Sequence, residues 1–160
     1  MRTVGIAAAL SLVAVSAACG YSATGGASRL PKGAERVHVP PFANRTSDAE
    51  AGALVASALR DELARRGTAG GEGAPARIEG AVTRVSAAPV TTESGTWRLV
   101  FEVQDRLVVD GKDAAAASVR REVDYLGEVD AIATEGRRRL AVRKAAAEAA
   151  RDIVERFEAP

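Results

Sequence analysis

The stretch "TWRLVFEVQDRLVVDG", residues 96–111, decides the fold of this chain. Apolar and polar side chains alternate along it, which is typical of a strand with one buried face. Leu99, Phe101 and Val103 share the apolar parity, whereas the other parity carries Arg98, Glu102, Gln104 and Arg106. The stretch closes on Asp110–Gly111, a pair that favours a two-residue hairpin turn. It therefore predicts a long strand followed by a tight reversal of the chain.

Two further alternating segments flank this strand. "ARIEGAVTRVSA", residues 76–87, precedes it, and "AASVRREVDYLG", residues 116–127, follows the turn. Both segments alternate with a period of two, so the sequence predicts three consecutive strands. Asp105 interrupts the apolar row of the central strand, and we expect it to mark a β-bulge or the margin of the sheet.

A fourth strand and a helix are predicted before these three strands. "ERVHVPPF", residues 35–42, alternates and ends at a double proline, which has no N–H to donate to a ladder. Ser47 and Glu50 have the spacing of a capping box, and apolar residues then recur with helical spacing. Gly67 is a natural stop, so the first helix is expected over about 48–66.

A long amphipathic helix is predicted at the C-terminal end, over about 129–158. Gly136 is a weak point in it, so the helix could also begin after this glycine. The element order is strand, helix, three strands, helix. The sequence therefore predicts an α+β fold in which two amphipathic helices pack on one face of a four-stranded mixed sheet. The other face carries charged and amide side chains, as expected for a surface that meets water or a polar partner.

The N-terminal residues 1–18 are typical of a secretory signal peptide. Arg2 supplies a positive start, an apolar run follows, and Ser16, Ala17 and Ala18 are small. The apolar run is shorter than the roughly 20 residues that span a bilayer as a helix. The only cysteine of the chain, Cys19, comes directly after these small residues.

Ala17, Ala18 and Cys19 resemble a bacterial lipobox, in which the cysteine is acylated and becomes the first residue of the mature chain. Ser16 departs from this pattern, because an aliphatic residue is usual there. The alternative is an ordinary secreted protein with a free cysteine. Gly20 follows Cys19, and this resembles the sorting signal for the outer membrane. We expect a lipid-anchored protein on the periplasmic side of that membrane.

Composition limits what the mature chain can do. Residues 19–34 are rich in Gly, Ser and Ala and are expected to form a tether. Residues 35–160 then form a single domain. Without residues 1–18 the chain has 21 basic and 21 acidic residues, whereas a nucleic-acid-binding protein usually shows a basic excess. We therefore expect no nucleic-acid partner.

The sequence offers no constellation for catalysis. His38 is the only histidine, and no cysteine or second histidine lies at metal-ligand spacing from it. The Gly-rich segment 67–75 follows a helix and lacks the lysine of a phosphate-binding loop. A serine nucleophile motif is absent as well. We expect a protein that is not an enzyme and that needs no cofactor and no metal.

The chain resembles the LptE family of lipopolysaccharide-assembly lipoproteins. Members typically begin with "CGY" or "CGF", matched here by residues 19–21. They also carry a phrase close to "LP-x-G-x-x-x-V-x-V-P-x-F-x-N-R-T", matched by Leu30 to Thr46. Beyond about Gly67 the resemblance rests on the order of elements. The "SATG" of residues 22–25 departs from the family, where "HLRG" or a similar segment is common.

This resemblance implies a plug inside the outer-membrane barrel LptD, a role in assembling that barrel, and binding of lipopolysaccharide. Strand parity, rather than a family motif, suggests which arginines could pair with lipid A phosphates. Arg120 and Arg121 point to opposite faces of one strand, so both cannot line one surface. The competing interpretation is that these arginines are solubilising surface charges. The candidates are Arg84, Arg98, Arg106, Arg120 and Arg121.

A different class of function is also compatible with a lipid anchor, a tether and a small α/β domain. LpoB-like outer-membrane lipoproteins regulate a peptidoglycan synthase in the inner membrane. Reaching that enzyme needs a long arm, whereas residues 20–33 span at most about 50 Å when fully extended. The short tether favours a partner at the outer membrane.

Overall fold

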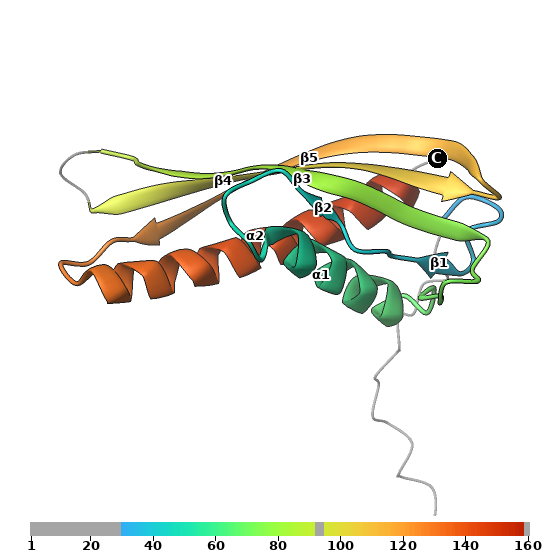
Figure 1. The fold of residues 1–160 in the computed structure, drawn as a ribbon, viewed down its shortest axis with the longest axis horizontal. Helices are drawn as coiled ribbons and strands as arrows, with labels where there is room; N and C mark the ends of the chain where they lie inside the picture. The colour runs from blue at the N-terminus through green and yellow to red at the C-terminus, as the bar shows by residue number, and fades with distance from the viewer. Residues whose placement is uncertain (1–29, 92–94, 159–160) are drawn as a thin grey trace, which may run out of the picture.

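The computed structural model describes residues 30–91 and 95–158, so the expected signal peptide and Cys19 lie outside the described part (Figure 1). The described chain forms two layers, a sheet and a pair of helices on one of its faces. Its elements are β1 (Val37–His38), β2 (Ala43–Asn44), α1 (Ala51–Arg65), β3 (Ala76–Pro89), β4 (Thr96–Val109), β5 (Lys112–Leu126) and α2 (Ala131–Glu158). The predicted α+β class is confirmed.

The three long strands form an antiparallel meander, as the alternation predicts. β4 lies in the middle and pairs with β3 on one side and β5 on the other. Asp110 and Gly111 connect β4 to β5, both with positive φ, of 49° and 77°. These angles are those of the type I′ turn that matches the twist of a hairpin. β1 and β2 run parallel to β3 along its other edge, so the sheet is mixed.

The described sheet has five strands rather than four, because the chain pairs with β3 again, in β2, after the double proline that ends the predicted first strand. Pro40 and Pro41 separate β1 from β2, and neither proline has an N–H to donate to β3. β1 pairs with the beginning of β3, and β2 pairs with it further along, at Ala81 and Val82. The double proline therefore interrupts the edge strand without removing the chain from the edge.

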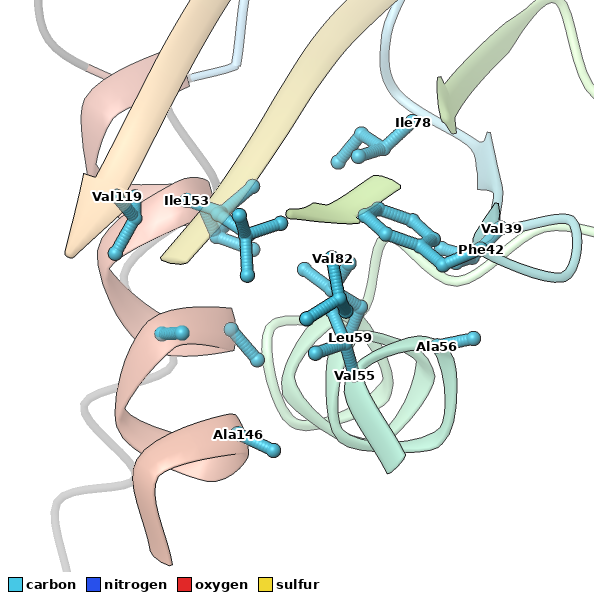
Figure 2. Packing of buried hydrophobic residues seen from close by; sticks show 14 of the residues in the cluster. Val39, Phe42, Val55, Ala56, Leu59, Ile78, Val82, Val119, Ala146 and Ile153 are labelled. Carbon is cyan, nitrogen blue, oxygen red and sulfur yellow. The ribbon is translucent and has the colours of Figure 1, made fainter. Parts of the chain in front are cut away.

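The helices cover only the face of the sheet that the apolar parity predicts. Leu99, Phe101 and Val103 of β4 are fully buried beneath them. Figure 2 shows Val55 and Leu59 of α1 packed beside α2 and below the strands. Alanines dominate the buried side of α2, which lets this helix pack closely on β5 and on α1. They are Ala141, Ala145, Ala146, Ala149 and Ala150.

Gly80 in β3 makes room for Phe42. A Cβ atom at Gly80 would first clash with the backbone carbonyl oxygen of Gln104 on β4, and it would also lie 2.9 Å from both Phe42 Cε1 and the Cα of Asp105. Phe42, which belongs to the proline-containing edge segment, is 6% exposed and joins the core (Figure 2). The glycine thus accommodates the close approach of an aromatic ring to the strand backbone.

Asp105 lies within regular pairing, so the expectation that it marks a bulge or the sheet margin is wrong. It faces Gly80 on β3 and Ala117 on β5 without a break in register. The register shifts lie elsewhere, between Val82 and Arg84 and between Leu107 and Val108. Asp105 points to the helix layer and is only 5% exposed, because the alternation of a regular strand places it there.

The helix ends differ in detail from the expected ones. α1 begins at Ala51 with Glu50 as its N-cap, and no side chain caps it, so the predicted capping box does not form. Asn44 instead organises the preceding loop, because its side chain accepts from Thr46 and donates to the Asp48 carbonyl. α2 continues through Gly136, which does not interrupt it. No helix within the described residues is long and apolar enough to cross a membrane.

Candidate functional site

Four of the five candidate arginines lie on the sheet face opposite the helices. Arg84, Arg98, Arg106 and Arg120 project from the outward side of β3, β4 and β5, and each side chain is about half exposed. Alternation predicts this outward position for Arg98, Arg106 and Arg120. Arg84 shares the parity of the buried Ile78 and Val82, and it faces outward because the register shifts between Val82 and Arg84. Each of them, however, already has a carboxylate partner on a neighbouring strand or on its own strand.

Glu102 and Glu122 occupy the centre of this outward face. Glu102 lies 3.6 Å from the Arg84 guanidinium and 3.2 Å from that of Arg120. Arg120 also donates to Glu122 at 2.7 Å, and this hydrogen bond raises the pKa of Arg120. Glu122 in turn lies 3.7 Å from Arg98. The charges therefore form one chain of ion pairs across three strands.

The arginines at the two ends of the outward face are also paired with carboxylates. Arg98 forms a two-pronged interaction with Asp124, with N–O distances of 2.8 and 2.9 Å. The hydrogen bond from Arg98 lowers the pKa of the Asp124 carboxyl. At the other end Arg106 lies 2.7 Å from Glu79 and 3.6 Å from Asp113. An anion that approaches these arginines must compete with a carboxylate for each of them.

Arg121 occupies the covered face and does not join the other four arginines. Its guanidinium donates to Asp152 of α2. This hydrogen bond raises the pKa of Arg121. The structure thus places Arg121 between sheet and helix, where it ties α2 to β5. Its position makes it unsuitable for a ligand that lies on the outward face.

An apolar groove opens at the end of the molecule where β5 leads into α2, at the left in Figure 1. Its volume is about 430 Å³. Val123 and Tyr125 of β5 form one wall, and Leu140 and Ala141 of α2 form the other. Desolvation in this groove raises the pKa of the Tyr125 hydroxyl. Such a groove suits a narrow apolar group, for example a hydrocarbon chain.

Cationic and apolar side chains flank this groove. Arg137 and Lys144 line it, and Arg137 is paired with Glu128. The nearest carboxylate to Lys144 is Glu148 at 3.9 Å, so Lys144 is the less restrained cation. Large exposed apolar residues gather around the same end, which is unusual for a solvated surface. They are Leu126, Val129, Ile132 and Leu140, with exposures from 55% to 109%.

The sequence reasoning did not single out this groove. Leu140 and Ile132 were signals that could have revealed it, because both lie in α2 outside its buried stripe. Helical periodicity places Arg137 and Lys144 on the exposed side of α2, but the sequence does not show that β5 ends beside them. The groove depends on where the strand and the helix meet in space.

The described residues hold no constellation for metal binding. Within residues 30–91 and 95–158, no group of three or more His, Cys, Asp or Glu side chains could hold a metal ion. Asp105 is the buried acid that stands out. Neither of its carboxylate oxygens has a hydrogen-bond partner among the described residues, and desolvation raises its pKa to about 7.

Comparison with known proteins agrees with this architecture. A lipoprotein from Caulobacter crescentus superposes with a TM-score of 0.60 at 20% identity, over 79% of this chain and 90% of that one. The rare lipoprotein B of Shewanella oneidensis gives 0.55 at 16% identity, over 75% and 92%. PelC of Paraburkholderia phytofirmans gives 0.56 at 19% identity, over 80% and 91%. At these identities the likeness shows the shared fold alone.

Two helices cover one side of an antiparallel meander, and the parallel strands β1 and β2 line the edge of that meander at β3. This arrangement defines the chain as a two-layer α+β domain of a kind that occurs in bacterial lipoproteins. The sequence model of one family matches residues 34–157, which is most of the chain. The chain belongs to this family, the LptE family of lipopolysaccharide-assembly proteins. It is a family of lipoproteins without enzymatic activity. No curated protein sequence gives a significant match.

Proposed function

We propose that this protein is an outer-membrane lipoprotein that plugs the LptD barrel, helps it to assemble and assists the delivery of lipopolysaccharide to the outer leaflet. The observation that carries this proposal is the family match, because it spans residues 34–157 and therefore nearly all of the described domain. Proteins of this family take part in lipopolysaccharide assembly. A small domain suits that role best as a plug inside the lumen of the barrel.

The outward face of the sheet supports docking against a polar wall. Barrels of the outer membrane have polar interiors. Arg84, Arg98, Arg106 and Arg120 are each paired with a carboxylate, so this face presents charges that need no further partner. A surface of this kind can meet a polar wall through hydrogen bonds without leaving an unpaired charge behind.

Anchoring through Cys19 would hold the domain at the periplasmic side of the outer membrane. A single acyl chain gives only reversible membrane binding, whereas the several chains of a bacterial lipoprotein give a stable anchor. The tether of residues 19–34 is short, which favours a partner in the same membrane. A barrel meets this condition, whereas a synthase in the inner membrane does not.

Lipopolysaccharide would bind at the groove between β5 and α2 rather than along the outward face. The lipid carries acyl chains and phosphates, and the groove offers an apolar channel beside Arg137 and Lys144. Lys144 is loosely paired, so a phosphate could reach it without displacing a close carboxylate. The outward-facing arginines remain second candidates, since each phosphate there would compete with an ion pair.

The test is a pull-down of the tagged full-length lipoprotein from detergent-solubilised outer membranes, with mass spectrometry of the proteins that co-purify. A Cys19→Ser chain made in parallel is the matched control, since it cannot be acylated at this position. We expect the chain with Cys19 to recover a large barrel in stoichiometric amount, and the Cys19→Ser chain to recover much less of it. Recovery of a peptidoglycan synthase in place of the barrel would favour the regulator hypothesis and contradict the plug.

A further inference from the structure

One side of the long helix α2 stays exposed to solvent in the described structure. The buried stripe of α2 packs on the sheet and on α1, and the helix runs beneath the sheet for most of its length (Figure 1). Exposed residues recur at helical spacing on the opposite side. We call this side the solvent face of α2, and it comprises Ile132, Arg139, Leu140, Arg143, Lys144 and Arg151.

The solvent face of α2 is cationic, although the whole chain is nearly neutral, with a formal net charge of +1. Within residues 30–91 and 95–158, the side chains of Arg143 and Arg151 have no ion-pair or hydrogen-bond partner. Arg139 lies 3.1 Å from Glu135, but its side chain remains 69% exposed. An anion can therefore reach two free guanidinium groups on this face without displacing a carboxylate.

Two large aliphatic side chains lie on the same face. Ile132 is 83% exposed and Leu140 is 64% exposed. Ile132 does not line the groove between β5 and α2, so that groove does not account for its exposure. Apolar and basic side chains together on an exposed helix are typical of a helix that lies in a membrane interface. Arginines suit this position because their aliphatic stems pack on apolar surface while the guanidinium stays at the phosphates.

Charge and hydrophobicity together select the occupant of the solvent face. A two-fold contact between two copies of this face would bring its cations against one another, which is unfavourable. The polar interior of a barrel would cover Ile132 and Leu140 without offering them apolar partners. A bilayer with anionic phospholipids offers phosphates to the arginines and acyl chains to the aliphatic residues, so it meets both conditions.

We propose that the solvent face of α2 binds the surface of a bilayer that contains anionic phospholipids. Arg143 and Arg151 meet the phosphates, and Ile132 and Leu140 enter the boundary between headgroups and acyl chains. From residue 132 to residue 151 the helix extends over about 29 Å, so it lies flat along the surface. The inference does not rest on the proposed function, because it concerns the chain outside a barrel.

Vesicle flotation of the chain without its lipid anchor tests this binding. The chain used comprises residues 19–160 with Cys19→Ser, so that neither the apolar run of residues 1–18 nor an acyl group contributes. It keeps every described residue. The probes are phosphatidylcholine vesicles with and without phosphatidylglycerol. We expect binding to the vesicles that contain phosphatidylglycerol, and we expect it to weaken as salt rises, because ions screen the attraction between arginines and phosphates.

Variants of the solvent face separate this contact from general stickiness. Arg143→Ala with Arg151→Ala should lower the partition coefficient about 25-fold, fivefold for each arginine, which corresponds to roughly 1 kcal/mol per basic residue at an anionic surface. Ile132→Ser should lower it about tenfold, because an aliphatic contact with lipid is lost. Circular dichroism of each variant checks that the chain is folded.

A matched control removes the same charge from another part of the domain. Arg36 precedes β1 and Arg45 follows β2, and both are exposed. Their side chains also have no ion pair among residues 30–91 and 95–158. Arg36→Ala with Arg45→Ala should change the partition coefficient by less than about twofold, because charges away from the lipid surface are screened.

Each outcome decides the proposal. Binding that needs phosphatidylglycerol, and that falls with the Arg143 and Arg151 pair but not with the control pair, supports it. Equal binding to both kinds of vesicle overturns it, and so does an equal loss in the control pair. Absence of vesicle binding overturns it as well, and binding to micelles of purified lipopolysaccharide alone would assign the face to that lipid. The pull-down judges the plug separately, so failure here leaves that proposal standing.

Discussion

The guanidinium of Arg121 on β5 is paired with the carboxylate of Asp152 on α2, across the interface between the two layers. The Asp152 side chain is only 16% exposed there, compared with 39% for Arg121. The preceding residue, Arg120, points to the opposite face and pairs with Glu102 and Glu122. Adjacent arginines therefore have different roles, one between the layers and one on the outward surface.

Replacing Arg121 by alanine should destabilise the domain more than the same change at Arg120. Arg121→Ala leaves the largely buried Asp152 without its partner, and we expect a loss of about 1 kcal/mol, since water partly screens the pair. Arg120→Ala leaves Glu102 beside Arg84 and Glu122 beside Arg98, so it should leave the midpoint of urea unfolding almost unchanged. Urea titrations of both variants measure the difference, and equal midpoints would contradict the role given to Arg121.

The stability of the domain should depend on pH through Asp105. Its pKa is about 7 in the folded chain, raised from 3.8 by burial. A raised pKa means that the folded state holds the proton more tightly than the unfolded state. The stabilisation is therefore complete below about pH 4 and is lost as the pH rises to about 7, by on the order of 4 kcal/mol.

Asp105→Asn is the variant that isolates this dependence. It keeps the shape of the side chain and cannot ionise, so its melting temperature should change less between pH 5 and pH 8 than that of the unmodified chain. Thermal unfolding of both chains at the two pH values gives the comparison. If the two chains lose the same stability over this interval, another group is responsible and Asp105 is paired in solution.

The alternation of apolar and polar residues in the sequence predicted most of the fold, and the features that it missed have identifiable physical causes. Alternation fixed which side of β4 is buried, because each side chain of a strand has only two faces to occupy. The same rule separated Arg120 from Arg121 correctly. The interruption at Pro40–Pro41 was visible, but whether the chain would rejoin β3 depends on how Phe42 packs against Gly80.

The candidate site was harder to predict than the fold, because it depends on which residues meet across strands. Parity placed Arg98 and Arg120 on one face, yet it did not reveal Asp124 and Glu102 as their partners, since register decides that pairing. The groove beside Leu140 required knowing where β5 ends relative to α2. Neither fact is encoded in a local pattern.

A methyl group at Gly80 should be costly despite its small size. Gly80→Ala would drive a Cβ atom into the backbone carbonyl oxygen of Gln104 and place it 2.9 Å from both the Asp105 Cα and the Phe42 ring. The backbone cannot move as a flexible side chain can, so we expect a loss of about 1–3 kcal/mol. Chemical unfolding measures it. Gly73→Ala is the control, since nothing lies within 4 Å of a Cβ there, and it should change stability little.

Replacement of Gly136 by alanine, in contrast, is expected to stabilise the domain. This glycine is exposed within α2, and a Cβ atom added there would meet nothing within 4 Å. Alanine favours the helical conformation over glycine by about 0.5–1 kcal/mol. Gly136→Ala should therefore raise the melting temperature by a few degrees. An unchanged or lower melting temperature would indicate that the first turns of α2 are not helical in solution.

Lipopolysaccharide binding should depend on the groove between β5 and α2 more than on the outward face. Lys144→Glu reverses the loosely paired cation of the groove, whereas Arg84→Glu makes the same kind of change on the outward face, beside Glu102. If the groove holds a lipid phosphate, Lys144→Glu should weaken binding of purified lipopolysaccharide by about tenfold, equivalent to the 1.4 kcal/mol of one charged contact. Arg84→Glu should weaken it less than threefold, and the reverse ranking would return the site to the outward-facing arginines. Because both side chains are more than half exposed, neither change should unfold the domain, and circular dichroism of each variant checks this.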